Sequence, residues 1–152
     1  MDIVRNFPLF NIVMCLMCGV VSSVFGAKQA KRLSLFLIGA AFFMNIAVLA
    51  FVAKEGQYTY MMGHFPAPWG NEIRVGMLEA VIAVFFCAIM FLSVLGGEHY
   101  IALDIEDAKS NLYFTMIDLM LASLLALIYT NDLFTAYVFV EINTIAAGAL
   151  IM

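Results

Sequence analysis

Two acidic side chains stand inside long apolar segments, where a carboxyl group could take up and release a proton. Glu141 lies near the middle of an otherwise uncharged segment that begins at Leu133, and Asp118 interrupts the segment before it. An ionised carboxylate inside a membrane helix is costly, and such residues mark ion or proton pathways by default. Glu141 and Asp118 are therefore the first candidate functional residues.

Helical spacing places hydroxyl groups beside Glu141. Tyr137 precedes it by about one helical turn and Thr144 follows it by about one turn, so the three side chains share a face that Gly148 extends. This face suits a hydrated path or a contact with another protein. The alternative is a neutral, hydrogen-bonded carboxyl that serves packing alone, and we favour the functional interpretation.

The other acidic residues have plainer interpretations. Asp118 is equally consistent with an ion path and with pairing to a Lys or Arg of another chain. Glu79 opens an apolar segment, where the helix dipole favours a negative charge, so we interpret it as structural. Asp132 directly precedes Leu133 and is predicted to cap the last helix. The tight turn at Asn131 and Asp132 should make the two flanking helices an antiparallel pair.

The sequence predicts no cofactor and no metal site. Cys15 and Cys18 form a C-x-x-C pair inside an apolar segment, where we interpret them as small apolar fillers. His64 and His99 fall in loops at opposite faces, which disfavours haem ligation. Asn45 is predicted, like Asn143, to form hydrogen bonds between helices.

The composition excludes a soluble protein. Of 152 residues, 65% are hydrophobic and 12% are charged, whereas a soluble domain has about half apolar and about a quarter charged residues. The net charge of −4 leaves no basic surface for a nucleic acid. We therefore expect an all-α, polytopic integral membrane protein.

A single transmembrane domain, 1–152, is predicted. A membrane helix needs about 20 apolar residues, and five segments have that length. A signal peptide is the competing interpretation of the first segment, but a weakly charged start and the lack of a clear cleavage site favour a spanning helix. The predicted helices cover about 7–26, 33–53, 76–97, 111–130 and 133–152.

The loops predict how the chain is oriented in the membrane, and they predict a short hairpin on its outer surface. Lys28, Lys31 and Arg32 cluster in the first loop, which should therefore be cytoplasmic, with the N-terminus outside and the C-terminus inside the plasma membrane. The outer loop carries the Pro- and Gly-rich stretch Gly63–Gly70, in which Phe65 and Trp69 suit the headgroup region. This stretch is predicted to form a short surface hairpin.

The stretch that begins at Tyr129, Y-T-N-D-L-F-T-A-Y-V-F-V-E-I-N-T, resembles a signature of the antiporter-like family, T-G-D-L-F-N-L-Y-V-F-F-E-I. That family comprises the large subunits of Mrp-type cation/proton antiporters and their relatives in respiratory complex I and membrane-bound hydrogenases. The segment Gly63–Ala80 also resembles the outer loop and third-helix start of the Mrp D type.

The resemblance implies roles for two residues. Glu141 falls on the family's fifth-helix glutamate, a proton-path carboxyl, and Asp132 falls on the aspartate of its turn, where Asn131 replaces Gly. Neither Glu79 nor Asp118 takes a role from the family. Family members have many more helices and a partner lysine on a later one, so this sequence resembles an N-terminal part that is split or truncated after the fifth helix.

The implied function is that of a membrane subunit in a multi-subunit cation/proton-translocating complex. Its proton or ion path would use Glu141, Tyr137 and Thr144, with Asp118 as a further candidate. We expect partner membrane subunits, one of which supplies the remaining helices and a Lys near Glu141, and H⁺ or Na⁺ as cargo. No redox site is expected in this chain, although the complex could be redox-driven. The alternatives are an accessory structural subunit and a small complex I-type membrane subunit.

Overall fold

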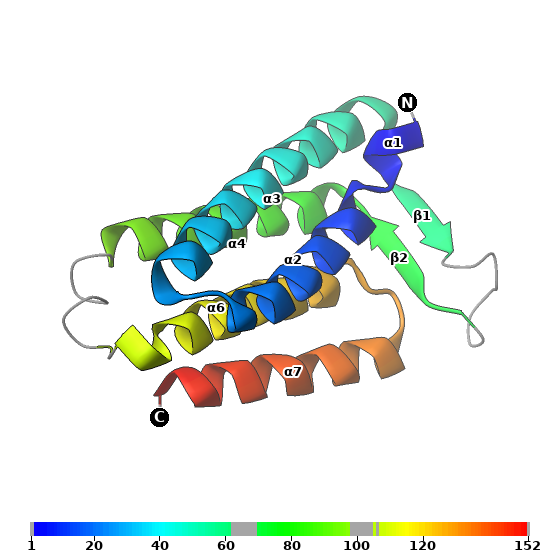
Figure 1. Ribbon diagram of the computed structural model, residues 1–152. Coiled ribbons are helices and arrows are strands. Elements are labelled where there is room, and N and C mark those ends of the chain that lie inside the picture. The colour runs from blue at the N-terminus through cyan, green and yellow to red at the C-terminus, as the bar shows by residue number, and fades with distance from the viewer. Residues whose placement is uncertain (1, 62–69, 98–104, 106, 152) are drawn as a thin grey trace.

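The structure, a computed structural model, describes residues 2–61, 70–97, 105 and 107–151. A helical bundle carries one small hairpin at one end (Figure 1). The elements in chain order are α1 (Asp2–Arg5), α2 (Phe7–Val24), α3 (Ala27–Glu55), β1 (Tyr58–Met61), β2 (Glu72–Val75), α4 (Met77–Gly96), α6 (Asp107–Tyr129) and α7 (Leu133–Ile151).

Within the described residues, five helices are long and apolar enough to cross a membrane: α2, α3, α4, α6 and α7. The prediction of an all-α polytopic membrane protein is confirmed. Each helix is apolar nearly all round, as expected where lipid rather than water surrounds the bundle.

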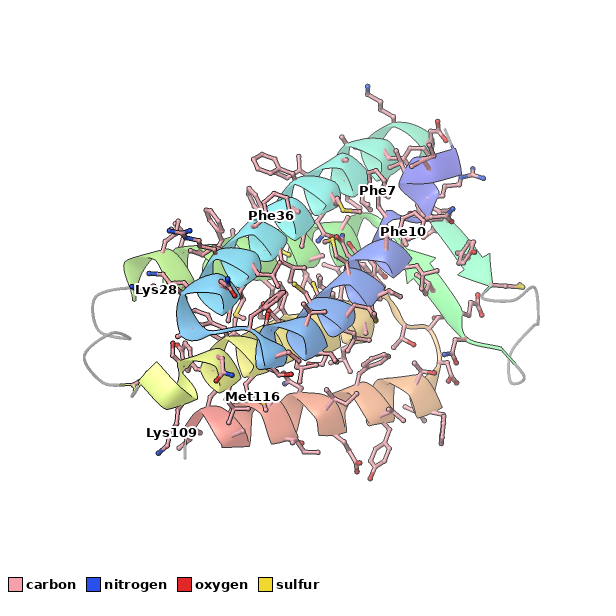
Figure 2. The ribbon with its side chains drawn as sticks, viewed as in Figure 1. Phe7, Phe10, Lys28, Phe36, Lys109 and Met116 are labelled. Atoms are coloured by element: carbon pink, nitrogen blue, oxygen red, sulfur yellow. The ribbon has the colours of Figure 1, made fainter. Side chains whose placement is uncertain are left out.

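The predicted start of the second membrane helix is wrong, and the error changes where three basic residues lie. Helix α3 begins at Ala27, not at Leu33, so Lys28, Lys31 and Arg32 lie in its first turns and not in a loop. Lys, Arg, Gln and Ala are all good helix formers, so nothing delays the helix after Gly26. Figure 2 shows Lys28 at the end of the bundle that also carries Lys109, away from the hairpin.

Helix α6 is the centre of the bundle and α7 is its most peripheral membrane helix. Helix α6 packs against α2, α3, α4 and α7, whereas the main contact of α7 is α6 alone. Of the most apolar stretch of α7 only 6% is buried, against 56% for α6. The buried core therefore lies between α2, α3, α4 and α6, and α7 lies along its side (Figure 1).

The hairpin is built from strands that flank the predicted stretch. Strands β1 and β2 pair antiparallel, with Tyr58 opposite Val75 and Met61 opposite Glu72. Residues 62–69, which include His64, Phe65 and Trp69, lie outside the described residues, as does His99.

Backbone and side-chain hydrogen bonds dock the hairpin on the turn between α6 and α7. The Asn131 N–H donates to the Glu72 carbonyl oxygen at 2.9 Å, and Ile73 forms an antiparallel bridge with Thr130. Thr135 Oγ1 lies 2.8 Å from Asn71 Oδ1, beside the start of α7. The hairpin thus holds the first turn of α7 in place.

Candidate functional site

Helix α7 starts at a side-chain cap. The Thr135 N–H and the Thr135 hydroxyl both donate to Asp132 Oδ2, at 2.9 Å and 2.7 Å. The hydrogen bonds from the Thr135 side chain and backbone hold the pKa of Asp132 below its ordinary value, because they stabilise the charged carboxylate. The predicted cap is confirmed, and it sets the direction in which α7 leaves the turn.

The structure brings Tyr137, Glu141 and Thr144 together on one exposed face of α7. The Tyr137 side chain is 61% exposed, and its hydroxyl group interacts with the Glu141 carboxyl one turn further along the helix. The Thr144 hydroxyl donates to the Glu141 backbone oxygen at 2.8 Å. Gly148 extends the face, and a Cβ built on it meets no atom within 4 Å. The three predicted site residues are adjacent, and their role stays a prediction.

The opposite face of α7 makes the contact with α6. The Ser123 hydroxyl of α6 donates to Asn143 Oδ1 at 3.3 Å, which confirms the predicted interhelical hydrogen bond. Ala146 of α7 is 1% exposed. Because Glu141 and Asn143 are roughly 200° apart around the helix, the contact with α6 turns Glu141 away from the bundle.

Asp118 belongs to a different place in the molecule. Its side chain is fully buried between α2, α3 and α6. The Ser34 hydroxyl donates to Asp118 Oδ1 at 2.6 Å, and the Ser22 hydroxyl donates to Oδ2 at 3.2 Å. Pairing of Asp118 with a cation of another chain is therefore wrong for this fold, because the carboxyl is enclosed and satisfied within the chain. Asp118 does not join the Glu141 face.

A second buried polar cluster lies around Asn45. The Tyr129 hydroxyl donates to Asn45 Oδ1 at 2.7 Å. The Asn45 amide donates to the Ala41 carbonyl oxygen at 2.9 Å and to Cys87 Sγ at 3.4 Å. The prediction that Asn45 links helices is confirmed. Tyr129 and the two serines at Asp118 were missed, although helical spacing does place Ser22 on the same α2 face as Cys15 and Cys18.

The cysteines and Glu79 occupy structural positions. Cys15, Cys18 and Cys87 are buried free thiols, and no group of three potential metal ligands occurs among the described residues. Glu79 lies in the first turn of α4, as the dipole argument predicts. Its carboxyl folds back over the start of the helix, since a Cβ built on Gly76 would lie 2.6 Å from Glu79 Oε2.

Comparison with known sequences gives distant but extensive similarity. No family model matches the chain. It is 27% identical over 126 residues to NADH-quinone oxidoreductase subunit N of Desulforudis audaxviator, which covers 83% of this chain and 24% of that protein. It is 26% identical over 145 residues to an uncharacterized protein of Methanocaldococcus jannaschii, covering 95% of this chain and 28% of that protein.

Two solved structures share the fold. One is a chain of the membrane-bound sulfane sulfur reductase, an archaeal respiratory membrane complex, with a TM-score of 0.79 and 19% identity over 98% of this chain. The other is a chain of the Mrp complex from Dietzia sp., with a TM-score of 0.81 and 19% identity over the whole of this chain. At the level of fold, the resemblance to antiporter-like membrane subunits is confirmed.

All four of these proteins are longer than this chain. The chain spans 24% and 28% of the two sequence relatives. It spans 30% and 28% of the two structural ones. The chain therefore matches less than a third of each of these proteins.

Proposed function

We propose that this chain is a membrane subunit of a multi-subunit cation/proton-translocating complex and that Glu141 is a proton-binding carboxyl at its contact with a partner. One observation carries the proposal. The Tyr137–Glu141–Thr144 face is exposed on the least covered membrane helix, so the chain itself leaves this carboxyl open.

The depth of Glu141 argues for a protein partner on this face. The residue lies about 12 Å along α7 from Leu133, close to the middle of a hydrocarbon core about 30 Å thick. A carboxyl directed at lipid there is costly, and intramembrane acids face protein or water instead. Helix α7 is therefore the surface on which the next helices of the complex pack.

The chemistry of the site also needs a charge from the partner. Tyr137 and Thr144 supply hydroxyl groups but no positive charge. A cation near a carboxyl favours its ionised form and an apolar setting favours its neutral form, and a carboxyl that carries protons needs both influences. A Lys ammonium suits this role better than an Arg guanidinium, because a buried Lys can lose its own proton.

The similar proteins support a place in a complex. Their names describe a subunit of NADH-quinone oxidoreductase, a respiratory membrane complex and an Mrp complex. From these relatives we infer that this chain also assembles with other membrane subunits. The proposed orientation, with the N-terminus outside and the C-terminus in the cytoplasm, follows from Lys28, Lys31 and Arg32, which all lie near the start of α3.

Replacement of Glu141 by Gln in the assembled complex tests the proposal. We expect normal assembly and loss of proton and Na⁺ flux across the membrane of everted vesicles. The matched control is Glu55→Gln, which removes an exposed carboxyl at the end of α3. Full flux with Glu141→Gln would assign the chain the alternative role of an accessory structural subunit, and measuring the two fluxes separately identifies the cargo.

A further inference from the structure

One buried polar side chain in the four-helix core has no visible partner. Asn11 of α2 is 0% exposed, and neither its Nδ2 nor its Oδ1 atom has a hydrogen-bond partner among the described residues. Asn45 and Asp118, which are equally buried, are both hydrogen-bonded. A buried amide without partners is costly, and such groups are commonly satisfied by internal water.

Asn11 is the first member of a buried stripe on the inner face of α2, with an amide at one end, a hydroxyl at the other and two weakly polar thiols between them. The stripe consists of Asn11, Cys15, Cys18 and Ser22, all of them buried. Their spacing places them on one helix face, which is turned toward α3 and α6. Ser22 donates to Asp118 at one end of this stripe. The thiol of Cys15 lies within electrostatic reach of both Asp118 and Cys87.

The antiparallel packing of α2 and α3 places Asn11 at the depth of Asn45. Ser22 and Ser34 meet at Asp118, which fixes the register of the two helices. The same number of residues separates Asn11 from Ser22 as separates Ser34 from Asn45. Asn11 and Asn45 are therefore level with each other, about 16 Å along the helices from the serine pair.

We propose that Asn11 binds internal water and that this water joins two buried polar clusters into one proton-conducting row inside the chain. The row runs from Asp118 past Cys15 to Asn11, and from there to Asn45 and Tyr129. The amide of Asn11 offers donors and an acceptor to water, and Asn45 Oδ1, at the same depth, keeps a second lone pair beside the bond from Tyr129. The ligand is water, and the exchanging species is the proton of Asp118.

The row ends at Tyr129, a fully buried residue at the hairpin end of the bundle. Tyr129 is the last residue of α6, and the next residue, Thr130, bridges to β2. Tyr129 also lies within electrostatic reach of Glu79 and Tyr58, both near that end. Asp118 thereby exchanges protons with the hairpin side through the chain's own helices.

The groups that face Asp118 come from two neighbouring helices. They are the Ser22 hydroxyl and the Cys15 and Cys18 thiols of α2, and the Ser34 hydroxyl of α3. The charged residue next to them in the sequence of α3 is Lys31, one turn before Ser34. Asp118 faces α2 and α3, whereas Ser123 of the same helix bonds α7. The row is therefore separate from the Glu141 face, and its test does not depend on the role of Glu141.

Hydrogen–deuterium exchange of the Asp118 carboxyl, followed by infrared difference spectroscopy on the full chain in lipid nanodiscs, tests the proposal. Asp118→Asn identifies the protonated-carboxyl band. We expect this band to shift promptly in D₂O in the wild type and in Asn11→Ser, which keeps a polar group and room for water. In Asn11→Leu the shift should be slowed roughly tenfold or more, because exchange then requires local opening of the bundle.

Two further variants complete the design. Asn143→Leu is the matched control: it removes the amide that joins α7 to α6, outside the row, and should leave the exchange rate of the Asp118 carboxyl unchanged. Tyr129→Phe removes the hydroxyl at the hairpin end of the row and should slow exchange, which tests the proposal even where Asn11→Leu fails to fold. Wild-type exchange rates in both Asn11→Leu and Tyr129→Phe, a wild-type band that does not exchange, or the lack of any Asp118 band at every pH at which the chain stays folded would each overturn the proposal.

Discussion

The Ser34 hydroxyl lies 2.6 Å from Asp118 Oδ1 and joins α3 to α6 across the buried centre of the bundle. The Ser22 hydroxyl adds a second, longer hydrogen bond from α2. Three membrane helices therefore meet at one carboxyl. In a bilayer, where apolar contacts alone do not favour helix association over lipid, such polar contacts and close packing hold helices together.

Loss of the shorter of these bonds should destabilise the bundle. For Ser34→Ala we expect the free energy of unfolding to fall by about 1–3 kcal/mol, the cost of leaving a buried polar group unsatisfied. Unfolding of the purified chain in mixed micelles, followed by circular dichroism, measures this. The control is Ser23→Ala, whose exposed hydroxyl donates to the Val20 carbonyl oxygen of its own helix. Equal stability of the two variants would contradict the expectation.

Close approach of α2 and α6 at Gly19 should make that position intolerant of larger side chains. A Cβ built on Gly19 lies 3.2 Å from the Leu119 side chain and 3.5 Å from the Thr115 carbonyl oxygen. We expect Gly19→Leu to lower the free energy of unfolding by about 1–3 kcal/mol through overpacking. Gly96→Leu is the control, because a Cβ on Gly96 meets nothing within 4 Å. A Gly19→Leu chain as stable as the wild type would show that the helices separate there at no cost.

The cap at Asp132 should make the start of α7 sensitive to acid. Its pKa is held below the ordinary value of 3.8 by hydrogen bonds from Thr135. The charged cap therefore stabilises the fold above the unfolded-state pKa, and that stabilisation is lost as the pH falls through the lower, folded-state pKa. Asp132→Asn keeps a capping side chain without the charge, so its stability should change less between neutral and acidic pH than that of the wild type. Identical pH profiles in a denaturation series would contradict this.

Tyr58 at the base of the hairpin should ionise late. Burial raises its pKa from 10.0 to about 12, against the opposing effect of the Arg5 charge. Because the folded-state pKa is the higher one, its contribution to stability is complete below about pH 10 and is lost as the pH rises toward about 12. Ultraviolet titration of tyrosinate should show one group fewer ionising near pH 12 in Tyr58→Phe than in the wild type. If the two titrations coincide, Tyr58 is not buried as described.

The local sequence pattern was sufficient to predict the membrane helices, the cap of α7 and the Tyr137–Glu141–Thr144 face. Each depends on neighbours in the chain: a run of about 20 apolar residues spans a bilayer, an Asp before a helix meets the free N–H groups, and residues one turn apart share a face. The predicted start of α3 at Leu33 is wrong because Lys28, Lys31 and Arg32 belong to the helix and not to the loop before it. Lys and Arg form helices well.

Only the tertiary structure decided which polar side chains meet inside the bundle. Ser22 and Ser34 are 96 and 84 residues from Asp118 in the sequence, and the bond from Tyr129 to Asn45 likewise spans 84 residues. In a soluble helix the apolar stripe marks the buried face, but these helices are apolar on nearly every side, because lipid and neighbouring helices are similar surroundings for Leu, Ile or Phe. The sequence therefore determined which segments lie in the membrane, and packing between them decided that Asp118 is enclosed and Glu141 is exposed.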